Sequence, residues 1–168
     1  MNKSKSKYLV ITIDVEPDCS YNWVYSNPLK FDGVSVGIKE ILHPMFNKYG
    51  IKPTYLINNV VLEDKKSVEI LKNLDGDYEL GAHLHPEFLE PQKTFDDYAG
   101  RKGEANLCFY PYEIQKEKIK NYKKLFLDKF GFNPVSFRAG RFSANKDTFE
   151  ILSNEGFLID TSATPTVK

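Results

Sequence analysis

The chain has 168 residues, of which 41% are hydrophobic and 27% are charged. This composition is typical of one globular domain and unlike that of a disordered segment, so we expect a single domain over residues 1–168. The 23 Lys and Arg residues balance the 23 Asp and Glu residues, so no net charge favours nucleic acid or an anionic membrane.

The amino terminus, MNKSKSK, looks like the start of a secretory signal, but the apolar run behind it, YLVITI, covers only residues 8–13. A signal peptide needs roughly 7–15 apolar residues and a membrane span about 20. The sequence therefore predicts a cytoplasmic protein with no transmembrane segment. Cys19 and Cys108 form no CxxC pair, so we expect free or structural thiols rather than a disulfide or a zinc-cysteine site.

Strand-like and helix-like segments alternate along the chain. After a first strand at 8–13, apolar residues at three- and four-residue steps predict a helix over 38–49, and Pro44 predicts a kink or break near His43. The later predicted elements are a strand at 53–57, a helix starting near Ser67, a strand at 78–85, a helix from Pro111 to Gly131, a strand at 135–138, a helix over 145–155 and a strand at 157–160.

Residues 86–110 interrupt this alternation. They show no sustained period, carry Pro, Gly and several aromatic residues, and are too long for an ordinary connection, which favours a binding loop. Elsewhere the alternation implies parallel strands joined by right-handed crossovers, and hence an α/β sheet or barrel. In such folds the chemistry gathers at the carboxyl ends of the strands.

Ionisable side chains stand at the ends of four predicted strands. They are Asp14 and Glu16, His83 and His85, Arg138, and Asp160. In an extended chain residues i and i+2 point the same way, so Asp14 pairs with Glu16 and His83 with His85. Two imidazoles and a carboxylate form a three-ligand set with open positions for water, as at a catalytic zinc or facial-triad iron site.

Each of these residues also has a simpler interpretation. Asp18, the third carboxylate of ITIDVEPD, is expected to solvate a turn or cap the next element, and His43 to be structural. In the functional interpretation Glu16 binds a divalent metal and Asp14 takes a proton from the metal's water. Arg138 then orients Asp14 through a charge-assisted pair, with a structural ion pair as its alternative.

The chain resembles the polysaccharide deacetylase family, which comprises the NodB-homology domains or carbohydrate esterase family 4. It looks most like the branch with Asp-Val-Glu in place of Thr-Phe-Asp-Asp-Gly. Four ordered segments carry the resemblance: TIDVEPD, GAHLHPE, FRAGRFSA and NEGFLIDTSATP. The resemblance implies a catalytic base at Asp14, a metal ligand at Glu16, and family motif positions at Arg138 and Asp160.

The chain also departs from the family pattern. His83 and His85 are two residues apart where the family has four, which leaves Glu87 as a rival third ligand, and Gly140 replaces a proline. The segment TFDDY (94–98) has nearly the same residues as the family's first motif, but it follows no predicted strand. We therefore do not interpret it as that motif. The family forms an irregular (β/α)7 barrel, so five strands imply that the last two are absent. The family's Leu-x-His general acid has no counterpart before Lys168, so the chain is a truncated product or another group completes the site.

The reaction that the resemblance implies is metal-assisted hydrolysis of an N-acetyl group on an amino-sugar polysaccharide or glycan, with Zn²⁺ as the expected ion. Several aromatic side chains are candidates for stacking on sugar faces, with core packing as the alternative. They include Trp23, Tyr25, Phe88 and Tyr98.

Two rival functions follow from the same residues. His-x-His at a strand end also suits another metal-dependent amidase on a barrel, although that site needs a carbamylated lysine or further histidines, and the sequence has only three histidines. The second rival is a non-catalytic carbohydrate-binding module that kept the deacetylase fold. The sequence does not define the oligomeric state.

Overall fold

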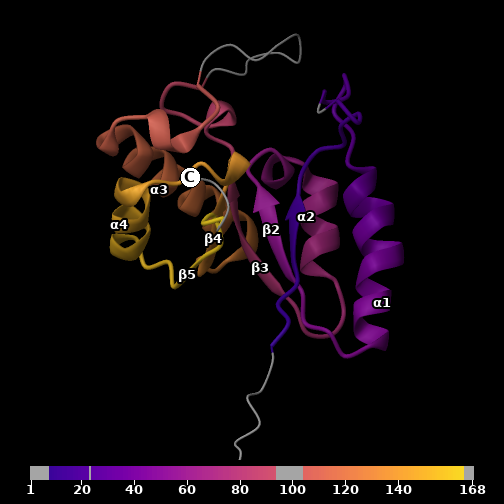
Figure 1. Ribbon diagram of the computed structural model, residues 1–168. Helices are drawn as coiled ribbons and strands as arrows, with labels where there is room; N and C mark the ends of the chain where they lie inside the picture. The colour runs from indigo at the N-terminus through magenta and orange to yellow at the C-terminus, as the bar shows by residue number, and fades with distance from the viewer. Residues whose placement is uncertain (1–7, 23, 94–103, 165–168) are drawn as a thin grey trace, which may run out of the picture.

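The computed structural model describes residues 8–22, 24–93 and 104–164 (Figure 1). Five strands form one sheet in the order β1-β2-β3-β4-β5, and every pair is parallel. They are β1 (Thr12–Val15), β2 (Thr54–Asn58), β3 (Glu79–Leu84), β4 (Ser136–Ala139) and β5 (Ile159–Asp160). The α/β fold with five parallel strands is therefore confirmed. The strand order follows the chain order, as in the wall of a β/α barrel, whereas a doubly wound sheet reverses direction.

Helices connect the strands. The longer ones are η1 (Gly33–Leu42), α1 (His43–Lys48), α2 (Lys65–Lys72), α3 (Tyr112–Phe130) and α4 (Lys146–Asn154). The 3₁₀ turns are η2 (Val61–Glu63), η3 (Pro86–Phe88), η4 (Leu107–Phe109) and η5 (Gly140–Phe142). In Figure 1, α1 and α2 lie to the right of the sheet and α3 and α4 to its left. Within the described ranges no helix combines the length and apolarity needed to cross a membrane.

Local sequence signals account for the helix ends. η1 is wound as a π-helix and changes to the α-form at His43, with Pro44 in the first turn of α1, which agrees with the break expected there. α3 lies between Pro111 and Gly131 as predicted, and Gly131 adopts φ 82°, the left-handed conformation that glycine favours at a helix end. Most helix predictions were thus correct to within a few residues.

The first strand was predicted too early. Its pairing with β2 begins at Thr12 opposite Thr54, whereas Tyr8, Leu9 and Val10 lie outside the sheet and are largely exposed. The apolar run begins at Tyr8, before Thr12, where pairing with β2 begins. The hydrophobic pattern alone therefore placed the start of the strand too early. As a consequence, Asp14 lies within β1 rather than after it.

The sheet has two unlike faces because neighbouring side chains along each strand alternate. One face contributes Val15, Tyr55, Ile57, Ala82 and Phe137 to the hydrophobic core, which residues of η1, η2, α2, α3 and α4 complete. The other face is mostly polar, and by register it carries Thr12 and Asp14 on β1, Thr54 on β2, Glu79 and His83 on β3, and Ser136 and Arg138 on β4. The apolar face therefore belongs to the core, whereas the polar face carries side chains that could take part in a reaction.

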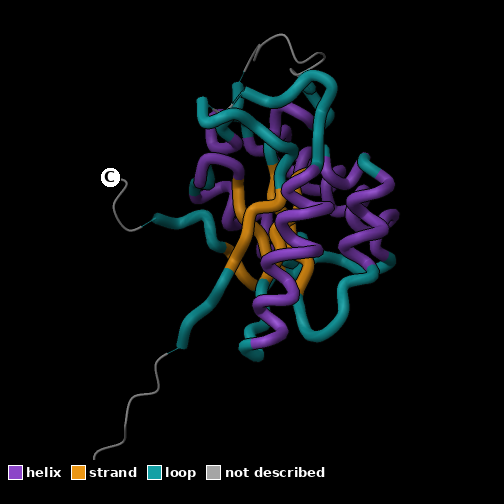
Figure 2. The backbone as a smooth tube through the Cα atoms, turned by 90° about the vertical axis from the view of Figure 1, so that its right-hand side faces the viewer, coloured by secondary structure: helices purple, strands orange, loops and turns teal. Residues whose placement is uncertain are grey.

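Loops cover the carboxyl ends of the strands. The β1 and β2 arrows point to the upper end of the molecule in Figure 1, and Figure 2 shows the loops that gather at that end. This is the edge of the sheet at which the sequence places its ionisable side chains.

Candidate metal and catalytic site

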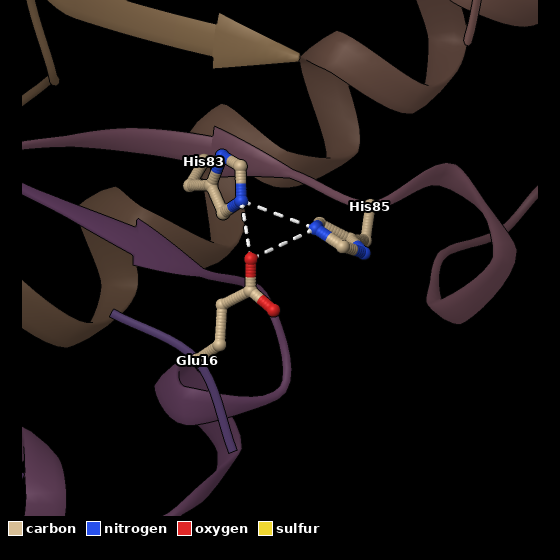
Figure 3. Close-up of side chains that lie close together, drawn as sticks. All are labelled: Glu16, His83 and His85. Atoms are coloured by element: carbon tan, nitrogen blue, oxygen red, sulfur yellow. Dashed lines mark hydrogen bonds and ion pairs between the residues drawn. The ribbon is translucent and has the colours of Figure 1, made fainter. Parts of the chain in front are cut away.

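Three side chains converge at the carboxyl ends of β1 and β3. Glu16 follows β1 directly, His83 lies near the end of β3, and His85 is the first residue after it. Glu16 Oε1 lies 2.8 Å from His83 Nε2 and 3.2 Å from His85 Nε2, and the two nitrogens are 3.1 Å apart (Figure 3). Strand register therefore brings together residues that are 67 and 69 positions apart in the chain.

This donor set fits a divalent cation. One ligand atom from each side chain lies within 4.8 Å of the others. Ligand atoms about 2.1 Å from a common Zn²⁺ lie about 3.0–3.4 Å from one another, close to the separations found here. Two imidazole nitrogens and a carboxylate oxygen that face one another repel through their lone pairs unless a cation or a proton lies between them.

A backbone contact orients His83. Its Nδ1 lies 3.2 Å from the carbonyl oxygen of Arg138. When Nδ1 donates its proton to that carbonyl, Nε2 presents a lone pair to Glu16, which is the tautomer of a metal-ligating histidine. The Arg138 carbonyl, which is not one of the three donors, thus helps to align His83, which is one of them.

Electrostatics keep the Glu16 carboxylate charged. Burial disfavours its ionised form, but the contacts with His83 and His85 outweigh burial and lower the pKa of Glu16. Burial also disfavours the charged form of His85, yet contacts with Glu16 and Glu87 raise the pKa of His85 above its usual value. A metal ion would displace the proton that this pair otherwise shares.

Asp14 and Arg138 form a second group beside the donor set. Arg138 Nη1 donates to Asp14 Oδ1 at 2.7 Å, while Nη2 and Nε donate to the hydroxyls of Thr12 and Thr161 at 2.7 and 3.0 Å. Asp14 Oδ1 lies 3.9 Å from His83 Nδ1, and 30% of its side chain is exposed. The guanidinium is held by three partners, so it fixes one oxygen of a solvent-accessible carboxylate.

Both groups face one cavity of about 590 Å³. Ten residues line it: Asp14, Glu16, Asn22, Tyr25, His83, His85, Arg138, Ala139, Arg141 and Phe142. The Tyr25 hydroxyl donates to Glu16 Oε2 at 3.3 Å, so the second carboxylate oxygen also has a partner. The cavity joins a metal-type donor set, a carboxylate and an aromatic wall.

The remaining predicted site residues lie elsewhere. Asp160 does not line the cavity, and its carboxylate accepts hydrogen bonds from the backbone N–H and hydroxyl of Ser162 at 2.9 and 2.7 Å. Phe88 is 6% exposed and packs against the rings of Tyr25 and His85, so its observed role is packing. Trp23, Tyr98 and the TFDDY segment lie outside the described residues.

The structural interpretations of Asp18 and His43 are supported. The Asp18 carboxylate accepts the backbone N–H groups of Asp32 and Gly33 at 2.6 and 2.8 Å, where η1 begins. His43 is 1% exposed, and its Nδ1 lies 3.0 Å from the Tyr55 hydroxyl, away from the cavity. Cys19 and Cys108 are free thiols, as expected.

Sequence reasoning missed the turn after β4. Arg141 and Phe142 line the cavity with φ values of 57° and 54°, in the left-handed region that side chains rarely adopt. Before them, Gly140 leaves room for His85, because a Cβ at position 140 would lie 2.6 Å from that ring. A second arginine three residues after Arg138 was the available signal in FRAGRFSA.

Neither the family models nor the curated proteins contain a match to this chain. Solved structures with a similar fold are found. The Streptococcus pyogenes deacetylase PplD, in complex with acetate, matches with a TM-score of 0.58 and 14% identity over 88% of this chain and 52% of its own. The chitin deacetylase of the fungal pathogen Colletotrichum lindemuthianum matches with a TM-score of 0.58 and 14% identity over 90% of this chain and 54% of its own.

A third similar structure is BA3943 from Bacillus anthracis, described as a CE4 family pseudoenzyme. It matches with a TM-score of 0.57 and 10% identity over 90% of this chain and 41% of its own. The chain therefore spans about half the length of these structures. At such low identities the likeness shows a common fold.

Proposed function

We propose that this chain is a member of the polysaccharide deacetylase family and contributes the catalytic centre of a metal-dependent hydrolase that removes N-acetyl groups from an amino-sugar glycan. One observation carries the proposal: the triangle of Glu16, His83 and His85 adjoins the Asp14–Arg138 pair in a single cavity. The similar folds of a chitin deacetylase and of a deacetylase bound to acetate support it.

Glu16, His83 and His85 are the residues that would hold the ion, and Zn²⁺ suits two imidazoles and a carboxylate. A bound divalent cation would polarise the acetyl carbonyl and lower the pKa of water. The protein's own contribution is to keep the three donor atoms pointed at one position, through the strand register and the Arg138 carbonyl.

Asp14 is the proposed general base. Its carboxylate lies in the same cavity as the donor set but is not part of that set, and Arg138 occupies Oδ1, so Oδ2 is the oxygen proposed to accept a proton. Arg138 donates to Oδ1 and orients Asp14, while the two threonine hydroxyls hold Arg138 in place. A positioned general base typically contributes about 10²–10⁴-fold to the rate.

The amino-sugar substrate is proposed from the residues that line the cavity. The side chains of Asn22 and Tyr25 offer polar contacts, and Phe142, 46% exposed, offers an aromatic ring in the same cavity. Aromatic faces and adjacent hydrogen-bonding groups suit the alternating apolar and polar surfaces of a pyranose ring.

A non-catalytic sugar-binding module is the second candidate. One similar fold, BA3943, is described as a CE4 family pseudoenzyme. This candidate predicts that metal and glycan bind without release of acetate.

Acetate release from acetylated chitooligosaccharide by the Zn²⁺-loaded chain, with metal content measured in parallel, tests the proposal. Asp14→Asn should reduce the rate by about 10²–10⁴-fold while bound Zn²⁺ is retained, because Asp14 lies outside the donor set. Glu16→Gln should lose both the metal and the activity.

The matched control is Asp77→Asn, the same change at a carboxylate whose side chain is 73% exposed and paired only with Lys52 in the described contacts. Zn²⁺ binding without acetate release by the unsubstituted chain would favour the non-catalytic module. Equal rates for the unsubstituted chain and Asp14→Asn would refute the assignment of the base.

A further inference from the structure

His85 is enclosed on several sides by residues outside the donor set. Gly140 lies against its ring, Phe88 packs on it with ring centroids 6.1 Å apart, and Asn59 Oδ1 accepts its backbone N–H at 3.2 Å. These contacts fix the plane of the ring. They do not determine which nitrogen carries the proton.

The tautomer of His85 depends on what faces Nδ1. Glu87 Oε1 lies 3.6 Å from Nδ1, and Arg141 Nη1 lies 3.5 Å from it. A carboxylate beside Nδ1 favours a proton on that nitrogen, which leaves a lone pair on Nε2 for the ion. An arginine that donated to Nδ1 would favour the opposite tautomer, with its proton in the donor triangle.

The contacts of Arg141 decide between these alternatives. Arg141 Nη2 donates to Glu87 Oε1 at 2.6 Å, and Nη1 donates to the carbonyl of Ala105 at 3.0 Å. Both contacts are shorter than the 3.5 Å to His85, so the N–H groups of Arg141 are directed mainly to Glu87 and the loop. Glu87 Oε1, 3.6 Å from Nδ1, is then the negatively charged acceptor beside that nitrogen, and its charge favours a proton there.

The burial of Glu87 indicates a role beyond one ion pair. Its side chain is 1% exposed, and Oε2 is buried without a hydrogen-bond partner among the described residues. Burying a carboxylate with an unsatisfied oxygen destabilises a fold, so such groups concentrate at functional sites. Arg141 in turn adopts a left-handed conformation, φ 57°, that is unfavourable for a residue with a side chain.

We infer that Glu87 and Arg141 form a positioning pair that holds His85 in the orientation and tautomer in which Nε2 faces Glu16 and His83. This inference rests on the proposed metal site and assigns Glu87 outside it, since its carboxylate contacts Arg141 and the outer nitrogen of His85. Glu87 is not among the residues that line the cavity, and Arg141 contacts it from the cavity side. Both act through His85.

Calorimetric titration of the whole chain with Zn²⁺ tests the inference. Glu87→Gln preserves the side-chain shape but removes the charge, and should weaken Zn²⁺ binding by about 10–100-fold, as loss of a carboxylate behind a ligating histidine does. Glu90→Gln is the matched control, because it makes the same change at an exposed position three residues away. Its affinity should stay within twofold of the unsubstituted chain.

A double substitution separates positioning from general damage. Arg141→Gln should weaken Zn²⁺ binding to a similar extent, and Glu87→Gln with Arg141→Gln should bind no more weakly than the worse single variant, because the pair acts as one unit. Thermal unfolding of the metal-free variants shows whether each one is folded. If Glu87→Gln does not fold, Arg141→Gln carries the test, since 25% of the Arg141 side chain is exposed.

The outcomes distinguish the inference from the proposed function. Zn²⁺ binding by the unsubstituted chain together with unchanged affinity in folded Glu87→Gln or Arg141→Gln would overturn the positioning pair and leave the metal site standing. Failure of the unsubstituted chain to bind Zn²⁺ would overturn both. Multiplicative losses in the double variant would overturn the pair as a unit.

Discussion

At the residue scale, the space around His85 determines what position 140 can hold. A Cβ there would lie 2.6–3.0 Å from three atoms of the His85 ring, closer than real Cβ contacts occur. The ring cannot simply move aside, because Phe88 packs on it and Nε2 belongs to the donor triangle. The glycine in FRAGRFSA is thus explained by a contact with a residue 55 positions earlier.

Gly140→Ala should therefore displace His85. We expect a loss of about 1–3 kcal/mol in the free energy of unfolding, the usual cost of overpacking, and weaker Zn²⁺ binding. Urea unfolding and calorimetric titration measure the two effects. Gly37→Ala is the control, since its nearest neighbour atom lies 4.0 Å from the added Cβ. A Gly140→Ala variant with unchanged stability and unchanged affinity would contradict the contact.

At the scale of elements, α3 is connected to the turn that follows β3 through one buried lysine. Lys118 on α3 is fully buried, and its Nζ donates to the carbonyls of Pro86 and Leu89 at 2.8 and 2.5 Å and lies 4.7 Å from the centre of the Tyr110 ring. These bonds satisfy backbone groups of the turn that carries Glu87. Burial lowers the pKa of Lys118 to about 8.

This lowered pKa predicts stabilisation at mildly alkaline pH. An unfolded lysine titrates near 10.5, so between pH 8 and 10.5 the unfolded state holds the proton more tightly than the folded state. The cost of burying the charge is fully present below pH 8 and declines as pH rises, with a slope of at most about 1.4 kcal/mol per pH unit.

Denaturant unfolding from pH 7 to 9.5, compared with Lys118→Met, measures this contribution. As pH rises, the free energy of unfolding of the unsubstituted chain should increase relative to that of Lys118→Met. Taking the difference between the two free energies cancels the pH dependence that comes from ionisable groups present in both proteins, including the tyrosines. A difference that stays constant over this range would show that Lys118 titrates normally in the folded state.

Elements were predicted well where the sequence itself ends them. Pro111 and Gly131 bound α3, and Asn145 and Thr148 form a reciprocal cap on α4, so both helices match their predicted ranges closely. β1 was misplaced because a strand ends where its partner ends, and that partner is 42 residues away. Strand limits are decided by pairing between distant segments.

At the scale of the whole molecule, the donor set connects β1 to β3 across β2. Glu16 lies beyond β1 and both histidines belong to β3 and its end. An ion held by all three would bind the folded chain and not the unfolded one, in which these residues are far apart. Metal binding should therefore stabilise the entire sheet.

Addition of Zn²⁺ at about 100 times its dissociation constant should raise the free energy of unfolding by about 2.7 kcal/mol, and chelation should reverse the gain. Thermal unfolding with and without the ion measures it. Glu16→Gln removes one of the three donors and should lose most of the gain. An equal gain in that variant would place the stabilising ion elsewhere.

The sequence alone determined the class of fold and the residues that converge. Hydrophobic runs alternating with helical periodicity imply parallel strands, parallel strands align their carboxyl ends, and the i, i+2 spacing of Asp14 with Glu16 and of His83 with His85 sets a common direction. These properties depend on residues that are close together in the sequence, so they can be inferred without a structure.

Only the tertiary structure decided the surroundings of the site. It placed Asp160 outside the cavity, left Glu87 outside the donor triangle, and brought Arg141 and Gly140 against Glu87 and His85. Each of these results depends on a contact between segments far apart in the chain. Periodicity and spacing report which way a side chain points along its own element, and they carry no information on which distant atoms fill the space that it points into.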